Sequence, residues 1–383
     1  MKNIVLLGAT GSIGDSCLNV IRQNKEHFHL FGIGLGSNLD KAQQIAKEFS
    51  PEHIFIAESH LDKSHDLLQS HSNILNTENE LQALIQDPSV DIVISAISGF
   101  AGLKASYFAI DAGKTILIAN KESIVAAGDI LMPLAQTKNS EIIPVDSEHN
   151  AIHQCFPPHR DLKEISKIMI TASGGPFRKK TFKELSGVTL QDALKHPTWN
   201  MGTKITIDSA TLVNKCLELI EAHYLFQIPE SQIEIVVHPQ SIIHSMVTFI
   251  DGSTIAQMSN PNMEVPIANA LGEECRIPIE YEPLNFADLE LTFKEFPKDR
   301  FQLESLAREI CNMGGSSGLV FNAANEIAVE SFLSKHISFC DIYEVIYRTF
   351  DSISLSKPSD IETLNELNKE ARMEAHKVIK SLT

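Results

Sequence analysis

Short apolar runs alternate with helix-like patterns through the first third of this chain. The apolar runs cover residues 4–7, 29–35, 53–57, 91–95 and 114–119, and helical patterns lie between them, as at 39–49 and 103–112. A continuous apolar run is typical of a parallel strand that is covered on both faces. Strands that alternate with helices across short polar joints predict an N-terminal Rossmann-like, doubly wound sheet.

The pattern changes in the middle of the chain. Residues 208–222 predict one continuous amphipathic helix whose apolar stripe is Val213, Cys216, Leu217 and Ile220. Apolar runs at 167–171, 233–237, 245–250 and 254–258 predict strands, and Asp251-Gly252 favours a hairpin turn in an antiparallel sheet. By analogy with other α/β enzymes, such a sheet suggests a dimer face.

Helical patterns dominate the last quarter, at 301–313, 316–333, 339–351 and 361–382, and predict a small bundle. The fold class is therefore α/β, with a central α+β catalytic domain between the Rossmann-like domain and the bundle. The expected divisions are a nucleotide-binding domain at 1–145, a catalytic and dimerisation domain at 146–275 with a lid at 174–202, a connecting arm at 276–300 and a helical domain at 301–383.

Composition narrows the possible partners. The 383 residues carry a formal net charge of −17, which argues against nucleic acid or an anionic membrane as a main partner. Six cysteines are scattered without a C-x-x-C pair, as expected in a reducing compartment. No signal-peptide core or membrane span is recognisable, so we expect a cytoplasmic protein.

A glycine-rich turn follows the first apolar run. Residues 8–14 read GATGSIG between a strand and a helix, the context in which glycines let a backbone approach a pyrophosphate at a helix N-terminus. The alternative is a turn without a ligand. The second strand ends in Gly36, Ser37 and Asn38 with no acidic residue at its tip, which favours NADP over NAD.

Two carboxylates stand close together after the run at 141–145. In an extended segment Asp146 and Glu148 would point to the same side and could hold a divalent cation such as magnesium or manganese. The alternative is a strand-to-helix turn capped by Asp146 or Ser147. Glu218 could supply a third carboxylate while Asn214 and Lys215 hold a phosphate; a surface Lys215–Glu218 ion pair is the other interpretation.

Two further polar segments suggest binding functions. Asn120, Lys121 and Glu122 follow an apolar run, either as site residues at a strand end or as a helix cap. Ser173 precedes a Gly-Gly turn, and the lysine-rich segment up to Gly202 contains Trp199, the only tryptophan. A basic segment with glycines at both ends predicts a lid over an anionic substrate, whereas an ordinary surface excursion is the alternative.

Eight stretches together resemble one enzyme family. They are GATGSIG, ANKES, VDSEHNAI, TASGGPF, HPTWNMG, IDSATLVNKCLELIEA, HPQSIIHSMV and NAANEIAV, which span nearly the whole chain. The chain is similar in all of them to the 1-deoxy-D-xylulose 5-phosphate reductoisomerases of the non-mevalonate isoprenoid pathway. The resemblance implies a metal-dependent rearrangement of this keto-sugar phosphate and reduction by NADPH to 2-C-methyl-D-erythritol 4-phosphate. It also implies that the protein is a homodimer.

The resemblance also implies roles for individual residues. It makes Asp146, Glu148 and Glu218 the metal ligands, and these three with Lys121 the catalytic residues. The implied substrate residues are Lys121, Ser147, Glu148, Ser173, His196, Trp199, Ser209, Asn214, Lys215 and Glu218. The implied cofactor residues are Thr10, Gly11, Ser12, Ile13, Gly36, Ser37, Asn38, Asn120, Glu122 and Gly202, and Trp199 and Met201 match the lid.

This chain departs from the family at Ser37, where members often carry a basic residue. Three other functions remain to be weighed. His149 and His153 stand at i, i+4 as in a zinc hydrolase, but the H-E-x-x-H glutamate is missing. A nucleotide-sensing regulator would leave the carboxylates unused, and a semialdehyde dehydrogenase would need a cysteine nucleophile at a helix start, where we find none.

Overall fold

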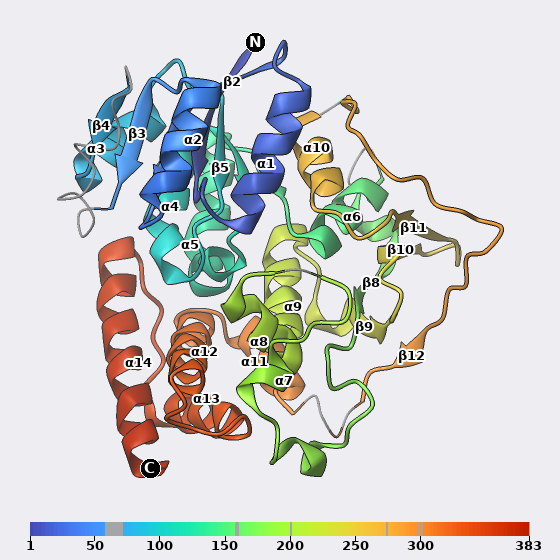
Figure 1. Cartoon of the computed structure of the whole chain (residues 1–383). Helices are drawn as coiled ribbons and strands as arrows, with labels where there is room; N and C mark the ends of the chain where they lie inside the picture. Colours follow the sequence, from blue (N-terminus) through green and yellow to red (C-terminus); the bar gives the residue numbers. More distant parts are fainter. Residues whose placement is uncertain are drawn as a thin grey trace. The chain divides into compact units, whose positions relative to one another are not determined.

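The computed structural model describes residues 1–57, 72–157, 161–199, 201–272, 275–297, 299 and 302–382 (Figure 1). The chain forms two compact units, each made of three segments. Unit 1 comprises Met1–Asn120, Leu131–Asn150 and Asn262–Glu282, and unit 2 comprises Lys121–Ile130, Ala151–Pro261 and Pro283–Thr383. The four functional domains predicted from the sequence divide the chain differently from these two units, and their functional assignment stays a prediction. Asn200 of the lid, positions 298 and 300 of the arm, and the predicted helix start at 301 lie outside the described residues.

A parallel sheet forms the centre of unit 1, as the apolar runs predict, and seven of its strands lie in the described residues. Its strand order is β4-β3-β2-β1-β5-β6-β7. All neighbouring strands are parallel, and the order reverses between β1 and β5, where ligands of doubly wound sheets bind. The strands are β1 (Lys2–Leu7), β2 (Phe28–Leu35), β3 (His53–Ile56), β4 (Asn73–Leu75), β5 (Ile92–Ser95), β6 (Thr115–Ile118) and β7 (Ile142–Pro144).

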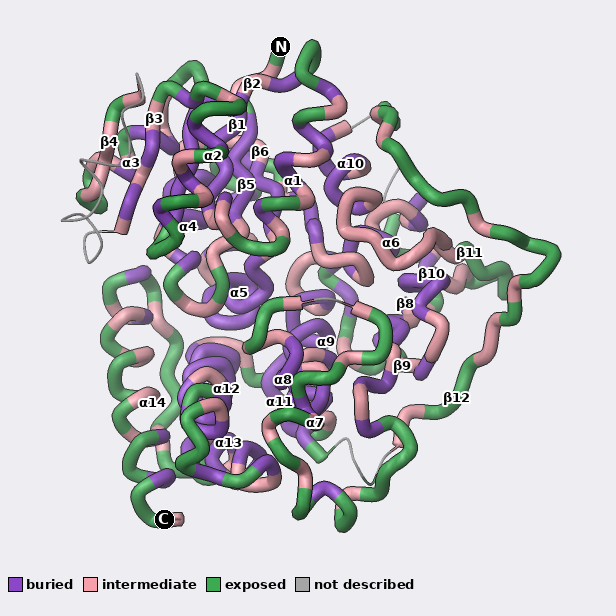
Figure 2. The backbone as a smooth tube through the Cα atoms, viewed as in Figure 1, coloured by how far each residue is buried: buried purple, intermediate pink, exposed green. Residues whose placement is uncertain are grey.

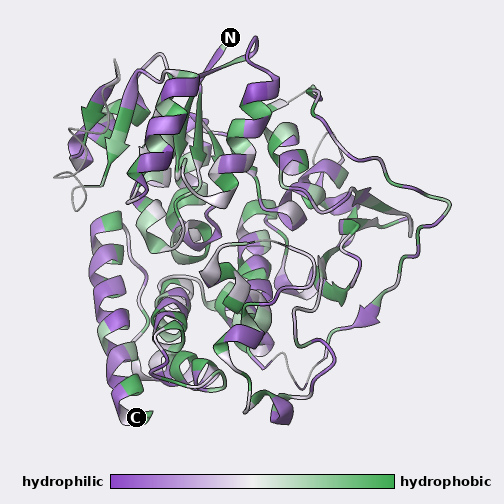
Figure 3. Cartoon of the chain, in the orientation of Figure 1, coloured by the Kyte–Doolittle hydropathy of each residue, from purple (hydrophilic) through white to green (hydrophobic). Residues whose placement is uncertain are grey.

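Amphipathic helices cover this sheet. Figure 3 shows α1 and α2 with hydrophobic and hydrophilic residues on different sides, and the buried side chains of α1 pack against the strands. A helix from much later in the chain, α10, contacts α1, because Asn19 of α1 donates a hydrogen bond to Glu264 of α10 at 3.1 Å. The helices are α1 (Ser12–Gln23), α2 (Leu39–Phe49), α3 (Glu78–Gln86), α4 (Leu103–Asp111) and α10 (Glu264–Gly272).

Two helices cross the boundary between the units along the chain. The first is α5 (Lys121–Lys138), which has non-helical backbone angles at Ala127 and continues from unit 2 into unit 1. The second is α6 (Ser147–Cys155), which begins in unit 1 and ends in unit 2.

Unit 2 contains a second sheet, whose five strands among the described residues have the order β11-β10-β8-β9-β12. The predicted hairpin is confirmed, because β10 and β11 are antiparallel and joined by a turn with Gly252 at φ +86°. The prediction of an antiparallel sheet for the strands at 233–237, 245–250 and 254–258 is wrong for the first of them, because β9 pairs in parallel with β8. The segment between β8 and β9 is mainly helical, and such a crossover brings the chain back in the same direction. The strands are β8 (Ile165–Ala172), β9 (Ile233–Val237), β10 (Ile243–Phe249), β11 (Thr254–Met258) and β12 (Lys294–Glu295).

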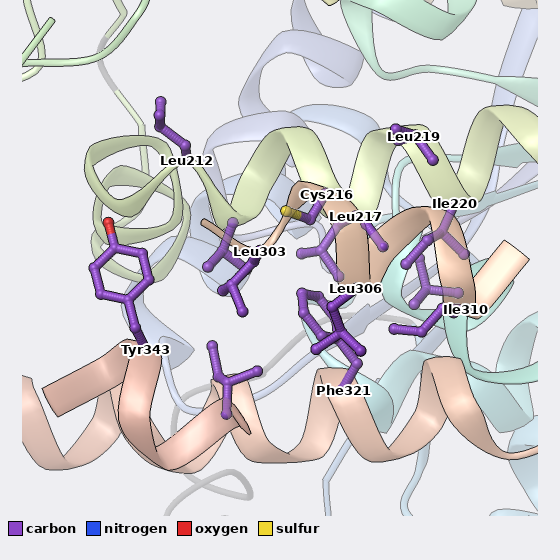
Figure 4. Packing of buried hydrophobic residues seen from close by; sticks show 14 of the residues in the cluster. Leu212, Cys216, Leu217, Leu219, Ile220, Leu303, Leu306, Ile310, Phe321 and Tyr343 are labelled. Carbon is purple, nitrogen blue, oxygen red and sulfur yellow. The ribbon is translucent and has the colours of Figure 1, made fainter. Parts of the chain in front are cut away.

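The predicted C-terminal helices are confirmed with small shifts at their ends. Figure 2 shows α12 buried along most of its length and α14 exposed on one side. The apolar core of unit 2 packs α9 against α11 and α12, as Leu217, Leu306 and Phe321 illustrate in Figure 4. The helices are α7 (Leu190–Ala193), α8 (Thr203–Thr211), α9 (Val213–Phe226), α11 (Glu304–Met313), α12 (Ser317–Leu333), α13 (Asp341–Ser352) and α14 (Ile361–Leu382). None of the helices in the described ranges is long and apolar enough to cross a membrane.

The prediction of one helix at 208–222 is wrong, because the helix breaks at Leu212. This residue has φ 67° and separates α8 from α9. The Thr211 hydroxyl donates to the carbonyl of Ile207 at 3.0 Å and accepts from the amide of Val213 at 3.4 Å. It therefore satisfies backbone groups on both sides of the break. The apolar periodicity hides this break, because the Leu212 side chain is buried with the rest of the stripe.

Candidate active site

The glycine-rich turn of unit 1 has the geometry of a phosphate-binding turn. Gly8 has φ +86°, and a Cβ on it would lie 2.3 Å from the Ala96 carbonyl oxygen. A Cβ on Gly14 would lie 2.4 Å from the Ala9 carbonyl oxygen, so this glycine lets α1 start close to the turn. Gly11 is the N-cap of α1 and provides no side-chain hydrogen bond. The first amides of α1 are thus available for an anion.

The tip of β2 lies open to solvent. Gly36, Ser37 and Asn38 are exposed, and the backbone amide of Lys41 donates to Asn38 Oδ1 at 3.1 Å, which caps α2. The Lys41 ammonium donates to the Thr10 carbonyl oxygen at 3.0 Å and to Asp15 Oδ2 at 2.6 Å. A lysine from the second βα unit therefore contacts the glycine-rich turn of the first.

Asn120 holds two strand ends of unit 1 together. Its side chain is buried, and its amide nitrogen donates to the carbonyl oxygens of Ile97 at 2.5 Å and Gly99 at 2.8 Å. The residue follows β6, whereas its two acceptors follow β5. Asn120 thus shapes the carboxyl edge of the sheet beside the point where the strand order reverses.

Asp146 and Glu148 lie at a strand-to-helix turn, so the prediction of an extended segment is wrong here. The backbone amide of Glu148 donates to Asp146 Oδ1 at 3.3 Å, as in a helix cap, because α6 already begins at Ser147. The Ser147 hydroxyl donates to Glu148 Oε2 at 2.6 Å. His149 is buried, with Nδ1 3.5 Å from Asp146 Oδ1. The two carboxylates remain partly accessible and one residue apart, with oxygen atoms suited to a hard cation.

A compact polar cluster in unit 2 joins α9 to the start of α5. Glu218 accepts from the Lys215 ammonium at 2.5 Å, from the Lys121 ammonium at 3.3 Å and from the Asn214 amide. The interpretation of Lys215–Glu218 as a surface pair is wrong, because these side chains are only 8% and 1% exposed. Two buried ammonium groups thus share the Glu218 carboxylate, and an ammonium group can also donate to an anion.

A second buried network in unit 2 surrounds Lys204. Its ammonium lies 2.7 Å from Glu122 Oε1 and 2.9 Å from Asp208 Oδ2. Asn325 of α12 donates to Asp208 Oδ1 at 2.9 Å. This residue lies in the NAANEIAV stretch, in which the sequence analysis identified no functional residue. Sequence reasoning also missed Lys204 and Asp208; their i, i+4 spacing was the available signal.

Burial and charge act in opposite directions in this network. Burial lowers the pKa of Lys204, but the attraction of Asp208 and Glu122 outweighs it, so the pKa is raised. Burial raises the pKa of Glu122, yet Lys204 pulls it below its usual value. The pKa of Asp208 is raised, mainly by burial. The network therefore holds Glu122, a predicted cofactor residue, in its charged form.

Residues of the predicted lid form a hydrogen-bonded chain within unit 2. His196 Nδ1 accepts from the backbone amides of Thr198 at 3.2 Å and Trp199 at 2.9 Å, which leaves the proton on Nε2. His196 Nε2 lies 3.1 Å from Ser173 Oγ, and the Gly175 amide donates to the same oxygen at 3.2 Å. With two donors directed at its oxygen, the Ser173 hydroxyl can donate its own proton to an anion.

The Gly-Gly turn and the tryptophan lie near the two ends of the predicted lid. Gly175 has φ +66°, and a Cβ on it would lie 2.7 Å from the Ser209 carbonyl oxygen, so the turn packs closely on α8. The Trp199 ring is half-buried, with its centroid 6.0 Å from that of His244. Met201 is half-buried, whereas Gly202 is exposed at the N-terminus of α8.

The predicted site residues are thus divided between the two units. Unit 1 contributes the glycine-rich turn, the tip of β2, Asn120, Asp146, Ser147 and Glu148, and unit 2 contributes the lid, Lys121, Glu122 and the α8–α9 residues. A Rossmann-like unit with a phosphate-binding turn, and a second unit with buried cations and carboxylates, define a nucleotide-dependent enzyme for an anionic substrate.

Comparisons with known proteins identify the family. Residues 4–128 match the family model for 1-deoxy-D-xylulose 5-phosphate reductoisomerase, residues 142–226 its C-terminal domain, and residues 258–374 the DXP reductoisomerase C-terminal domain. The 1-deoxy-D-xylulose 5-phosphate reductoisomerase of Francisella tularensis subsp. novicida is 44% identical over 372 residues, 96% of each chain. That of Shewanella frigidimarina is 42% identical over 395 residues and all of both chains.

Solved structures agree with this result over the full length. A DOX-P reductoisomerase in complex with NADPH, fosmidomycin and magnesium has a TM-score of 0.93 at 38% identity, covering 100% of this chain and 99% of that one. The reductoisomerase of Zymomonas mobilis in complex with NADPH has a TM-score of 0.92 at 41% identity, covering 99% of both. The chain belongs to the 1-deoxy-D-xylulose 5-phosphate reductoisomerase family.

Proposed function

We propose that this chain rearranges 1-deoxy-D-xylulose 5-phosphate and reduces the product with NADPH to 2-C-methyl-D-erythritol 4-phosphate, in non-mevalonate isoprenoid precursor biosynthesis. The observation that carries this function is similarity to reductoisomerases over the whole chain, at 42% identity to the Shewanella frigidimarina enzyme. The cofactors are NADPH and a divalent metal, as in the related structures with NADPH and magnesium.

The metal ligands in this proposal are Asp146, Glu148 and Glu218. Carboxylate oxygens are the ligands that magnesium and manganese prefer, and each of the three residues offers them. Asp146 and Glu148 are held by the turn into α6, and Glu218 is held by two lysines on α9 and α5. A bound metal would stabilise negative charge that develops on neighbouring substrate oxygens.

The substrate phosphate binds, in this proposal, where unit 2 offers ammonium, amide and hydroxyl donors. Lys215 and Asn214 supply donors on α9, and Ser209 lies on α8 against the Gly-Gly turn. Ser173 adds a hydroxyl donor, and His196 orients it by directing its Nε2–H at the Ser173 oxygen. A phosphate held by several donors is a remote handle that orients the reacting end of the substrate.

Lys121 and Ser147 are the remaining polar groups near the reacting end. We assign Lys121 a catalytic and substrate-binding role, because its ammonium is buried and contacts both Asn214 at 3.0 Å and Glu218 at 3.3 Å. Ser147 precedes Glu148 and donates to its carboxylate, so it would both orient this ligand and contact substrate. Trp199 and Met201 would close over the substrate and exclude water from the aldehyde intermediate.

NADPH binding is assigned to two groups of residues. The group in unit 1 comprises Thr10, Gly11, Ser12 and Ile13 at the start of α1, Gly36, Ser37 and Asn38 at the tip of β2, and Asn120. The group in unit 2 comprises Glu122, held by Lys204, and Gly202 at the start of α8. The exposed amides at the start of α1 support the assignment of the pyrophosphate to that helix.

A cysteine-based dehydrogenase is disfavoured by the thiols themselves. Burial raises the pKa of Cys17 to about 12, of Cys155 to about 11 and of Cys311 to about 12. A nucleophilic cysteine needs the opposite shift. Membership of the reductoisomerase family likewise leaves no basis for a zinc hydrolase or a non-catalytic regulator.

We also propose that the protein is a cytoplasmic homodimer. The edge strand β11 of unit 2 carries Ile255 at 51% exposure, and Ile250 beside the hairpin is 71% exposed. An edge strand with exposed apolar residues favours pairing with a second copy. Sedimentation velocity tests this, because a monomer mass at micromolar concentration would contradict it.

The function is tested by following NADPH oxidation after adding 1-deoxy-D-xylulose 5-phosphate, with and without magnesium. Glu218→Gln keeps the side-chain size but removes the ligand charge, so turnover should be lost while NADPH fluorescence still reports binding. Glu234→Gln, an exposed carboxylate on β9, is the matched control and should keep full activity. Turnover by Glu218→Gln at the wild-type rate would refute the metal role, and no turnover by the wild type would refute the function.

A further inference from the structure

The tip of β2 lacks the charge that an NADPH site needs. NADPH differs from NADH by a 2′-phosphate on the adenosine ribose, which sites of this type bind with a basic group near the end of the second strand. Between residues 36 and 42 the sequence is Gly-Ser-Asn-Leu-Asp-Lys-Ala, so Lys41 is the one basic residue there. We infer that Lys41 binds the 2′-phosphate and sets the preference of this chain for NADPH; this inference rests on the proposed function.

The position of the Lys41 ammonium supports the role. Asn38 caps α2 at the Lys41 amide, which places Lys41 in the first turn directly after the tip. Its ammonium then contacts the carbonyl oxygen of Thr10 at 3.0 Å, in the turn that binds the pyrophosphate. The adenosine ribose lies between a pyrophosphate and the tip of the second strand in sites of this fold. Lys41 contacts residues at both of these places.

The ammonium also has capacity for another partner. A lysine ammonium has three donors, and Thr10 and Asp15 accept from two of them. The Lys41 side chain is 26% exposed and Asp15 is 54% exposed, so solvent and a ligand can reach the pair. An ion pair this exposed is weak, and exchange of Asp15 for a doubly charged phosphate is favourable.

Asp15 provides an alternative explanation for the same lysine. A carboxylate in the first turn of α1 would repel a pyrophosphate at that helix start, and Lys41 neutralises it. A lysine that acted only in this way would strengthen NADPH and NADH binding equally. A lysine that contacts the 2′-phosphate would strengthen NADPH alone. The two roles therefore predict different ratios of the NADPH affinity to the NADH affinity.

The test measures binding by titration calorimetry for NADPH, NADH, adenosine 2′,5′-bisphosphate and AMP, with Lys41→Met against the wild type. Loss of a charged hydrogen bond to the 2′-phosphate should weaken NADPH about 10- to 100-fold more than NADH, and the bisphosphate about 10- to 100-fold more than AMP. Lys47→Met, an exposed lysine on the same helix, is the matched control and should change none of the four. The double variant Ser37→Lys/Lys41→Met should regain the preference for NADPH over NADH.

Two outcomes would overturn the inference. Equal weakening of all four ligands, or loss of the Lys41→Met effect in an Asp15→Asn background, would mean that Lys41 only neutralises Asp15. Unchanged binding of NADPH and the bisphosphate would mean that Lys41 does not contact the 2′-phosphate. Turnover with 1-deoxy-D-xylulose 5-phosphate is measured separately, so a wild type that binds NADPH tightly but does not turn over would contradict the proposed function and leave this inference standing.

Discussion

Replacing Lys204 by Met should destabilise unit 2 far more than the loss of an ordinary ion pair. Lys204 forms ion pairs with both Glu122 and Asp208, at 2.7 and 2.9 Å. Those carboxylates are 10% and 2% exposed, so without Lys204 they would stay buried and lose this counter-charge.

The magnitude follows from burial. Removing one partner of a fully buried pair costs about 3–5 kcal/mol, whereas an exposed pair is worth about 0–1 kcal/mol. Lys204 is 25% exposed, which screens part of the interaction. We therefore expect Lys204→Met to lower the free energy of unfolding by about 2–3 kcal/mol. We also expect weaker NADPH binding, since Glu122 would lose the ammonium that orients it.

Tryptophan fluorescence during urea unfolding measures this effect, because the only tryptophan, Trp199, lies in unit 2. Lys167→Met is the matched control: Lys167 pairs with Glu234 in the same unit, but the two side chains are 37% and 52% exposed. The double variant Lys204→Met/Asp208→Asn should recover part of the loss, because it removes one buried charge. Equal effects of Lys204→Met and Lys167→Met would refute the reasoning.

Two further variants test charge and packing. Burial raises the pKa of Glu122 but Lys204 lowers it further, so its contribution to stability is present above about pH 4.5 and is lost as the pH falls through its folded-state pKa. The difference in unfolding free energy between the wild type and Glu122→Gln should therefore shrink below about pH 4.5; a pH-independent difference would count against this. Gly14→Ala places a Cβ 2.4 Å from the Ala9 carbonyl oxygen and should cost unit 1 about 1–3 kcal/mol in urea unfolding. Gly36→Ala, with no atom within 4 Å, should cost little, and equal losses would contradict the packing argument.

The sheet of unit 1 could be predicted from sequence because its signals are local. Each central strand is a continuous apolar run, and a strand buried on both faces has little tolerance for polar residues. The glycine positions carry equally local information, since Gly8 and Gly14 have no space for a side chain. β4 escaped prediction because three residues with exposed and half-buried positions give no apolar run.

The turn at Asp146 shows how a correct residue assignment can rest on a wrong geometry. The extended-segment argument brought Asp146 and Glu148 together through a period of two, whereas in the structure a helix begins between them. Both arrangements leave two carboxylates close together, so the residue types identified the candidate ligands and the backbone conformation did not matter. The capping interpretation was also correct, because Asp146 accepts from the Glu148 amide.

Burial of charge was the part that sequence could not supply. Lys215–Glu218 and Lys204–Asp208 have the i, i+3 and i, i+4 spacing of surface pairs, and nothing within α8 or α9 marks them as different. What buries them arrives from distant segments: Lys121 contacts Glu218 from α5, and Asn325 contacts Asp208 from α12. Because the free energy of an ion pair depends on whether water is excluded, the same spacing means a weak surface contact in one place and a site in another. Asn325 is the informative case, since an amide inside an otherwise apolar helix has to find a polar partner, and here that partner is the carboxylate that orients Lys204.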